Sequence, residues 1–156
     1  MAWEIKINGF DHLERTLTNI SGAELDRQMK RTMEISCDQV RDRARQQLEE
    51  NKSVDTGELR RSVIKEVSKD SEGWKGVIGP SQPYGEPVEK GSRPHAVSAK
   101  KLESWAQKRG INPFALAASI RKKGTRPHPY MLPTLDRMRN KVIQNFENLI
   151  QAILKL

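Results

Sequence analysis

Two of the three histidines in this chain of 156 residues close the same five-residue phrase. Residues 91–95 read GSRPH and residues 124–128 read GTRPH. Neutral histidine is both a metal ligand and a base that works near neutral pH, so a pair of them could hold a metal ion or move a proton. Zinc sites place their ligands at short spacings, whereas these candidates are isolated from one another. They are His12, His95, His128 and the lone Cys37. We therefore expect no metal and no cofactor.

Catalysis by either phrase would need partners for the histidine. Glu86 and Glu89 stand near His95 in sequence and could orient it as a general base. The chain has no Gly-rich phosphate loop, no G-x-S-x-G elbow and no acidic cluster that would hold magnesium. We expect that the protein is not an enzyme, and a hydrolytic role is the third hypothesis.

The other use of the phrase is to shape the backbone. Gly91 and Gly124 permit positive φ, the next Ser or Thr can bond its own backbone, and each Pro holds the Arg before it extended. Two stiff loops that present arginines suit contacts between subunits. The candidates for such contacts are Tyr84, Glu89, Arg93, His95, Arg126, His128 and Tyr130. Alternatively, the tyrosines only cover the core edge, Glu89 only caps a turn, and the arginines are only solvated.

Composition indicates one soluble domain, residues 1–156, with a modest core: 35% of the residues are hydrophobic and 31% are charged. The net charge of +8 favours a polyanionic neighbour, although many of these charges belong to mixed-sign runs that usually cover a solvated surface. The thin core and the apolar stripes favour a homo-oligomer. No signal peptide or membrane span is evident, so we expect synthesis in the cytoplasm and no membrane partner.

The first half of the chain predicts a strand, helices and a hairpin. Alternation predicts a strand at 3–7, and two capping boxes, Asp11 with Glu14 and Ser21 with Glu24, predict a short helix followed by a long one to about Asn51. Asp55 or Thr56 is expected to cap one helical turn. Strands at 63–67 and 74–78 then form a hairpin with a loop of four or five residues. The long helix should bury one stripe: Leu25, Met29, Met33, Cys37, Val40, Ala44 and Leu48.

The second half predicts loops and three helices. Four prolines between 79 and 94 argue against a regular helix there. Ser98 is expected to cap a helix that ends at Gly110, and Asn112-Pro113 opens another that ends at Gly124. In that helix Phe114, Ala117 and Ile120 are expected to face inward. A last helix from Pro133 has a near-heptad seam that packs either on the long helix or on another subunit.

Three segments together resemble the neck and tail-completion proteins of tailed bacteriophages. That family shows D-T-G-x-L-x-x-S, then Y-x-x-x-x-E-x-G-T, then P-[FY]-[ML]-x-P-[AT]-L. The matching residues are Asp55, Thr56, Gly57, Leu59 and Ser62, then Tyr84, Glu89, Gly91 and Ser92, then Pro129, Tyr130, Met131, Pro133, Thr134 and Leu135. Ser92 stands where the family usually has threonine, and Gly85 and Pro87 interrupt the second segment.

The resemblance implies an α+β subunit, with long N-terminal and C-terminal helices packed on a small antiparallel sheet, and no enzymatic activity. It implies a ring at the junction of capsid and tail, a hexamer rather than a dodecamer, in contact with other neck and tail proteins and located in the virion. Residues 79–97 and 124–132 would be the interaction loops. The basic charge would face either packaged DNA or an acidic tail protein.

The rival hypothesis is a stand-alone nucleic-acid-binding protein. The charge supports it, and Trp3, Trp74 and Trp105 could stack on bases. Each tryptophan also lies where an amphipathic strand or helix would bury it, so its support for the rival is weak.

Overall fold

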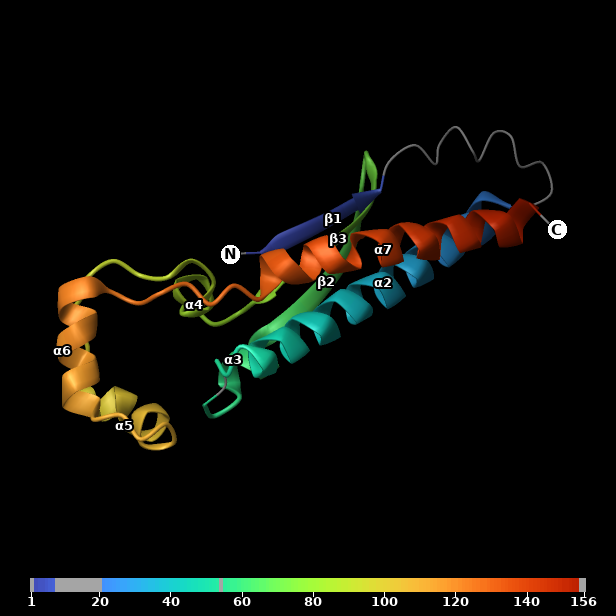
Figure 1. Cartoon of the computed structure of the whole chain (residues 1–156). Helices are drawn as coiled ribbons and strands as arrows, with labels where there is room; N and C mark the ends of the chain where they lie inside the picture. Colours follow the sequence, from blue (N-terminus) through green and yellow to red (C-terminus); the bar gives the residue numbers. More distant parts are fainter. Residues whose placement is uncertain (1, 8–20, 54, 155–156) are drawn as a thin grey trace.

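The computed structural model describes residues 2–7, 21–53 and 55–154. Figure 1 shows an elongated α+β molecule in which two long helices lie side by side under a small sheet, with two short helices set apart at one end. The elements are β1 Trp3–Ile7, α2 Gly22–Glu50, α3 Glu58–Ser62, β2 Val63–Asp70, β3 Gly73–Pro80, α4 Gly85–Lys90, α5 Ala99–Gln107, α6 Pro113–Lys123 and α7 Met131–Leu154. The predicted fold class is confirmed.

The long helix α2 forms where its capping and periodicity predict it. The Ser21 hydroxyl accepts a hydrogen bond from the Glu24 amide at 3.2 Å, as a capping residue does. All seven residues of the predicted stripe are buried, including Cys37, whose thiol pKa burial raises to about 11. The predicted capping box at Asp11 and Glu14, together with His12, lies outside the described residues.

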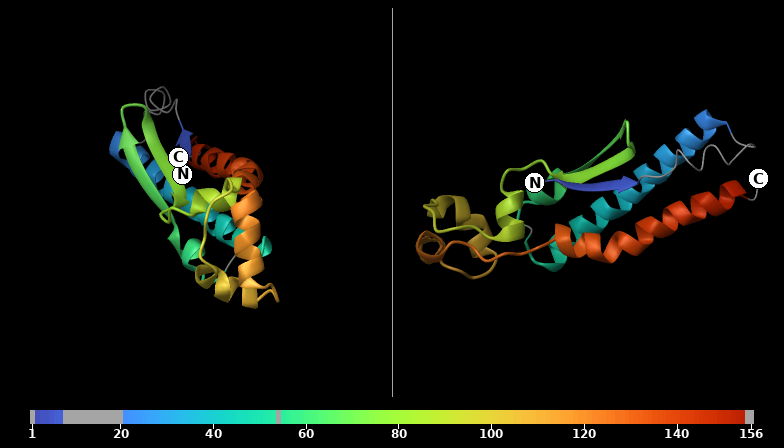
Figure 2. Two further views of the ribbon diagram at one scale, coloured as in Figure 1. Left: turned by 90° about the vertical axis from the view of Figure 1, so that its left-hand side faces the viewer. Right: turned by 90° about the horizontal axis from the view of Figure 1, so that it is seen from above.

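The sheet is antiparallel with the order β1-β3-β2, so the third strand in sequence lies at its centre. One face of the sheet packs on α2 (Figure 2). The hairpin loop is shorter than predicted, because Asp70 pairs with Gly73 and only Ser71 and Glu72 connect the strands. The Asp70 carboxylate accepts hydrogen bonds from the Glu72 and Gly73 amides at 2.8 and 3.1 Å, which closes the tight turn.

The C-terminal helix α7 packs on α2 within the same chain, which decides between the two alternatives left open by its seam. The two helices run antiparallel (Figure 1). Asn145 donates to Ser36 Oγ and Gln39 Oε1, both at 2.9 Å, and Arg137 donates to Gln47 Oε1 at 2.8 Å. The buried α7 residues of the core lie between these two polar positions, at Val142, and beyond Asn145, at Phe146, Leu149 and Ile153. Each such side chain contributes about 1.5–3 kcal/mol when fully buried.

One predicted absence of a helix and two predicted helix starts are wrong. Residues 85–90 form α4 despite Pro87, because a proline in the first turn removes an amide that has no partner within the helix. The first turn of α7 likewise includes Pro133, two residues after the helix begins at Met131. Neither Asp55 nor Thr56 is the N-cap of α3: Gly57 holds that position at φ 79°.

Residues 93–128 form a separate part, here called the lobe; the other described residues are the body. The lobe contains α5 and α6, which pack on each other at the end of the molecule (Figures 1 and 2). Asn112 caps α6 as predicted, since its side-chain oxygen accepts from the Phe114 and Ala115 amides. Ala117 and Ile120 are buried, but the prediction that Phe114 faces inward is wrong: it is 75% exposed.

Candidate functional site

The two repeated phrases meet and bind each other across the base of the lobe. Ser92 and Thr125 form an antiparallel bridge, with N–H···O distances of 3.2 and 3.1 Å. The Thr125 hydroxyl also donates to Ser92 Oγ at 2.9 Å. We call this pairing the bracket. It joins the chain entering the lobe to the chain leaving it.

Backbone conformation and close neighbours both exclude a side chain at Gly91 and at Gly124. Gly91 and Gly124 have φ values of 77° and 75°, a conformation that other residues adopt at a cost. A Cβ on Gly91 would lie 2.6 Å from the Thr125 carbonyl oxygen, and one on Gly124 would lie 1.9 Å from that of Ser92. The repeated glycines therefore allow the two segments to approach each other.

The two histidines are exposed, and each forms hydrogen bonds with nearby groups of the same chain. His95 Nδ1 lies 2.9 Å from the Arg93 carbonyl oxygen and 3.3 Å from Ser92 Oγ, so the ring closes its own loop. His128 is attached through its backbone amide, which donates to the Val88 carbonyl at 2.8 Å. Within the described ranges, no group of three or more His, Cys, Asp or Glu residues is placed to hold a metal ion.

Glu89 caps α7 from a segment 41 residues away. The residue is only 3% exposed, and its carboxylate accepts hydrogen bonds from the amides of Tyr130, Met131 and Leu132 at 2.7, 2.9 and 3.0 Å. These are orphan donors of the first helical turn, and a negative charge there also complements the helix dipole. The alternative that Glu89 only caps a turn agrees with the structure in that Glu89 is a cap. The element that it caps is the long helix α7 rather than a turn.

The two candidate tyrosines have different environments. Tyr130 is fully buried, and burial followed by the nearby Glu89 raises the pKa of its hydroxyl. Tyr84 is 39% exposed and lies 3.4 Å from the Glu58 carboxylate, and burial is again the first cause of its raised pKa. Tyr130 is therefore a core residue of this chain, whereas the exposed part of the Tyr84 side chain is available for a contact with another subunit.

A second attachment of the lobe involves the connection between α2 and α3. The Asp55 carboxylate accepts from Lys108 Nζ at 2.7 Å and from Ser104 Oγ at 3.1 Å, both on the α5 side of the lobe. The Lys108 hydrogen bond is the main reason that the pKa of Asp55 is lowered. Arg109, which also covers the Trp105 ring at 4.1 Å, donates to the Lys52 carbonyl.

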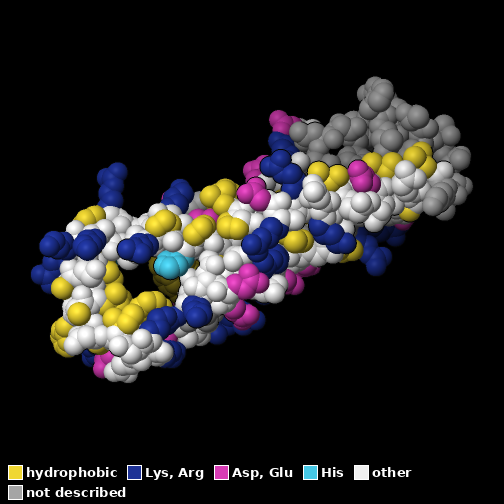
Figure 3. All heavy atoms as spheres, viewed as in Figure 1, with side chains coloured by type: hydrophobic (Ala, Val, Ile, Leu, Met, Phe, Trp, Pro, Cys, Tyr) yellow, Lys and Arg dark blue, Asp and Glu magenta, His cyan; other side chains and the backbone are white. Residues whose placement is uncertain are grey.

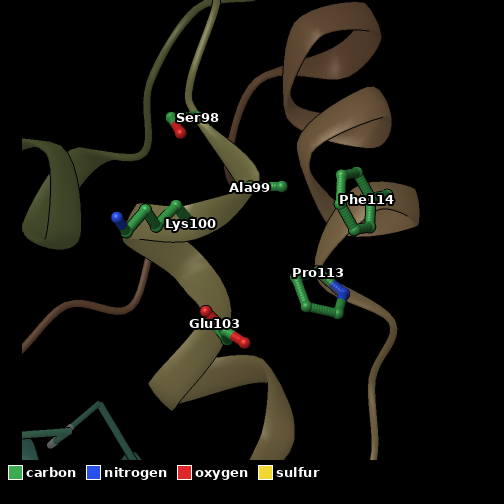
Figure 4. A pocket seen from close by; sticks show the side chains of 6 residues that line it. All are labelled: Ser98, Ala99, Lys100, Glu103, Pro113 and Phe114. Carbon is green, nitrogen blue, oxygen red and sulfur yellow. The ribbon is translucent and has the colours of Figure 1, made fainter.

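The lobe has a groove between its two helices with both apolar and polar lining residues. It has a volume of about 280 Å³ and is lined by Ser98, Ala99, Lys100, Glu103, Pro113 and Phe114. Figure 4 shows the Phe114 ring and Pro113 on one wall, with Ala99 pointing toward them from the other. Beyond the groove, Figure 3 shows a hollow between lobe and body whose walls carry hydrophobic side chains.

The net positive charge of the protein is confined to the lobe. Residues 93–128 hold nine of the 28 Lys and Arg residues and one of the 20 Asp and Glu residues, a net charge of +8. The other 120 residues hold 19 of each sign and are neutral. In Figure 3 the Lys and Arg side chains gather over the lobe, whereas both signs are mixed over the body.

The fold is thus a body of two long helices, two short helices and a three-stranded sheet, from which a positively charged lobe projects. A family model described as "Bacteriophage HK97-gp10, putative tail-component" matches residues 11–91, just over half of the chain. The chain belongs to this HK97-gp10-like family of phage tail components, and the predicted resemblance to tailed-phage proteins is confirmed. No curated protein and no solved structure matches the chain. No helix in the described part of the chain is long and apolar enough to cross a membrane.

The structure brings most of the predicted site residues together at the base of the lobe. Glu89 contacts Tyr130, and the two phrases carrying Arg93, His95, Arg126 and His128 pair through the bracket. Their role in contacts with other subunits stays a prediction. Sequence reasoning missed Asn51, which donates to the Pro129 carbonyl at 2.8 Å, and the exposure of Phe114. It also missed the confinement of charge, although counting charges between the two phrases would have found it.

Proposed function

We propose that this tail component completes the tail or joins it to the DNA-filled head, and that it does so as a ring of identical subunits, a hexamer rather than a dodecamer. The role is structural, with no catalytic step and no cofactor. Other neck and tail proteins are its partners, and the virion is where it acts.

The observation that carries this proposal is the apolar surface of the projecting lobe. The sequence of α6 begins PFALAASI, yet only Ala117 and Ile120 of the helix are buried in the chain itself. Phe114 is 75% exposed beside the groove and Ile111 is 39% exposed. Large apolar side chains grouped on a projection favour association, because burying them removes their surface from water. The occupant we propose is a neighbouring copy of this chain.

The assembly is tested by native mass spectrometry and negative-stain microscopy of the purified protein. Wild type is expected to form closed rings, and Phe114→Ser is expected to shift them to monomers. Ile143→Ser is the matched control, since Ile143 is 49% exposed on α7 of the body, away from the lobe. A monomeric wild-type protein at all concentrations would contradict the ring.

The role in the particle is tested by electron microscopy of phage lysates in which this gene carries a stop codon. Filled heads beside separate tails of normal length would identify joining or completion, and overlong tails would identify termination. Intact infectious particles would refute the structural role altogether.

A further inference from the structure

We propose that the lobe binds the phosphate backbone of double-stranded DNA without reading its sequence. This goes beyond the proposed structural role and holds for a monomer as well as for a ring. The surface consists of the seven exposed cations Arg93, Lys100, Lys101, Arg121, Lys122, Lys123 and Arg126.

The first argument is that these cations have no partner within the described part of the chain. Of the nine Lys and Arg residues of the lobe, only Lys108 forms an ion pair with a described residue, Asp55 of the body. Outside the lobe, 12 of the 17 described Lys and Arg residues form ion pairs. The cations of the body are therefore largely neutralised by acidic residues of the same chain, whereas those of the lobe are left for an anionic binding partner to neutralise.

The second argument is the position of the cations. Arg121, Lys122 and Lys123 form the last turn of α6, and Gly124 then starts the phrase that carries Arg126. The bracket brings Arg93 to the same base, because Ser92 pairs with Thr125. Like charges held together in this way repel one another, and a polyanion relieves that repulsion while releasing its counterions.

The third argument concerns the kind of polyanion. Lys is depleted at protein–protein interfaces, whereas phosphate contacts use Lys and Arg alike, and four of the seven cations are Lys. Single-stranded nucleic acid is bound with aromatic stacking platforms. The Trp105 ring is already covered by Arg109, and Phe114 lies at the opposite end of α6 from the Arg121–Lys123 run. Duplex DNA is therefore the polyanion that fits these residues best.

The test is fluorescence anisotropy of the full-length protein with a labelled duplex, titrated between about 50 and about 200 mM salt. The logarithm of the association constant is expected to fall linearly with the logarithm of the salt concentration. The triple variant Arg121→Gln, Lys122→Gln, Lys123→Gln should reduce the slope by about 2.7, three times the slope of ~0.9 per phosphate contact, and should lower the affinity at least about tenfold.

The matched control is Arg31→Gln, Arg139→Gln, Lys141→Gln. These body cations are exposed and have no ion pair with a described residue, so the control removes the same net charge from the other part of the molecule. It is expected to change affinity by less than about twofold. Circular dichroism verifies that both variants fold.

Three results would overturn the proposal. Equal weakening by the two triple variants would show that only net charge matters, and the absence of salt-dependent binding would show that the lobe does not bind DNA. Competition by polyglutamate as strong as that by unlabelled duplex would replace DNA with an acidic protein partner. None of these results depends on ring formation or on the phage phenotype, so failure here is distinguishable from failure of the proposed function.

Discussion

The body and the lobe differ in how far their apolar side chains are buried and their charged side chains are paired. In the body, one contiguous core joins α2, the sheet and α7, and most described cations have an anionic partner. The lobe buries only Ala106, Ala117 and Ile120 among its hydrophobic residues, all outside that core, and carries seven exposed cations that form no ion pair with a described residue. Packing and ion pairing within the fold therefore account for the side chains of the body. The exposed apolar and charged side chains of the lobe are instead accounted for by the binding partners that we propose.

The family match includes α2, α3, β2, β3 and α4 of the body and ends at Gly91, before the lobe; β1 and α7 of the body lie outside it. No residue of the lobe is matched, so the lobe's own residues carry the argument about its partners. Three changes test whether the two parts are as independent as this comparison implies.

The largest effect is expected from Glu89→Ala, which should destabilise the body. The variant leaves three amides at the start of α7 without their acceptor, and we expect the free energy of unfolding to fall by about 3 kcal/mol, as for loss of a buried charged acceptor. Denaturant titration measures this change. The control is Glu86→Gln on the same helix, where the carboxylate is exposed and pairs with Lys90, and this variant should unfold at nearly the same denaturant concentration as wild type. Equal effects of the two variants would contradict the capping role.

An intermediate effect, confined to the lobe, is expected from Gly124→Ala. The new Cβ would collide with the Ser92 carbonyl, so the bracket must open, at a cost of about 2 kcal/mol. Hydrogen exchange at the Ser92 and Thr125 amides should accelerate at least about tenfold while exchange in α2 is unchanged.

Gly110→Ala is the control that distinguishes the steric clash in Gly124→Ala from the cost of placing alanine at positive φ. Gly110 also has positive φ, at 65°, but a Cβ there would meet no atom within 4 Å. The control should cost about 1 kcal/mol and leave exchange at the bracket unchanged. Faster exchange throughout α2 in Gly124→Ala would mean that body and lobe unfold as one unit.

The smallest effect is expected on acidification, at the contact between Asp55 and the lobe. Because the folded pKa of Asp55 lies below its ordinary value of 3.8, the contact contributes fully above that pH and is lost as the pH falls through the lowered pKa. The contribution should be less than about 1 kcal/mol, as for other ion pairs near solvent. NMR shifts of the Trp105 indole should follow this loss below about pH 4 in wild type, and Asp55→Asn should abolish that pH dependence. An unchanged titration in the variant would assign the effect to another carboxylate.

Local signals in the sequence were sufficient for the elements that local interactions define. Ser21 and Asn112 cap their helices through amides two or three residues away, and the stripe of α2 follows from helical spacing alone. The fold class could be predicted for the same reason. The prediction failed at α4, where the general effect of proline outweighed its tolerated place in a first turn.

The sequence by itself determined the caps, the helical stripes, the glycines of both phrases and the balance of charge in each segment. Only the tertiary structure decided that Glu89 caps α7, that GSRPH pairs with GTRPH, and that Phe114 stays exposed. The physical reason is sequence distance. A cap or a stripe is specified by neighbours within one or two helical turns, whereas Glu89 and Tyr130, or Ser92 and Thr125, meet only after the intervening chain has folded back to bring them together.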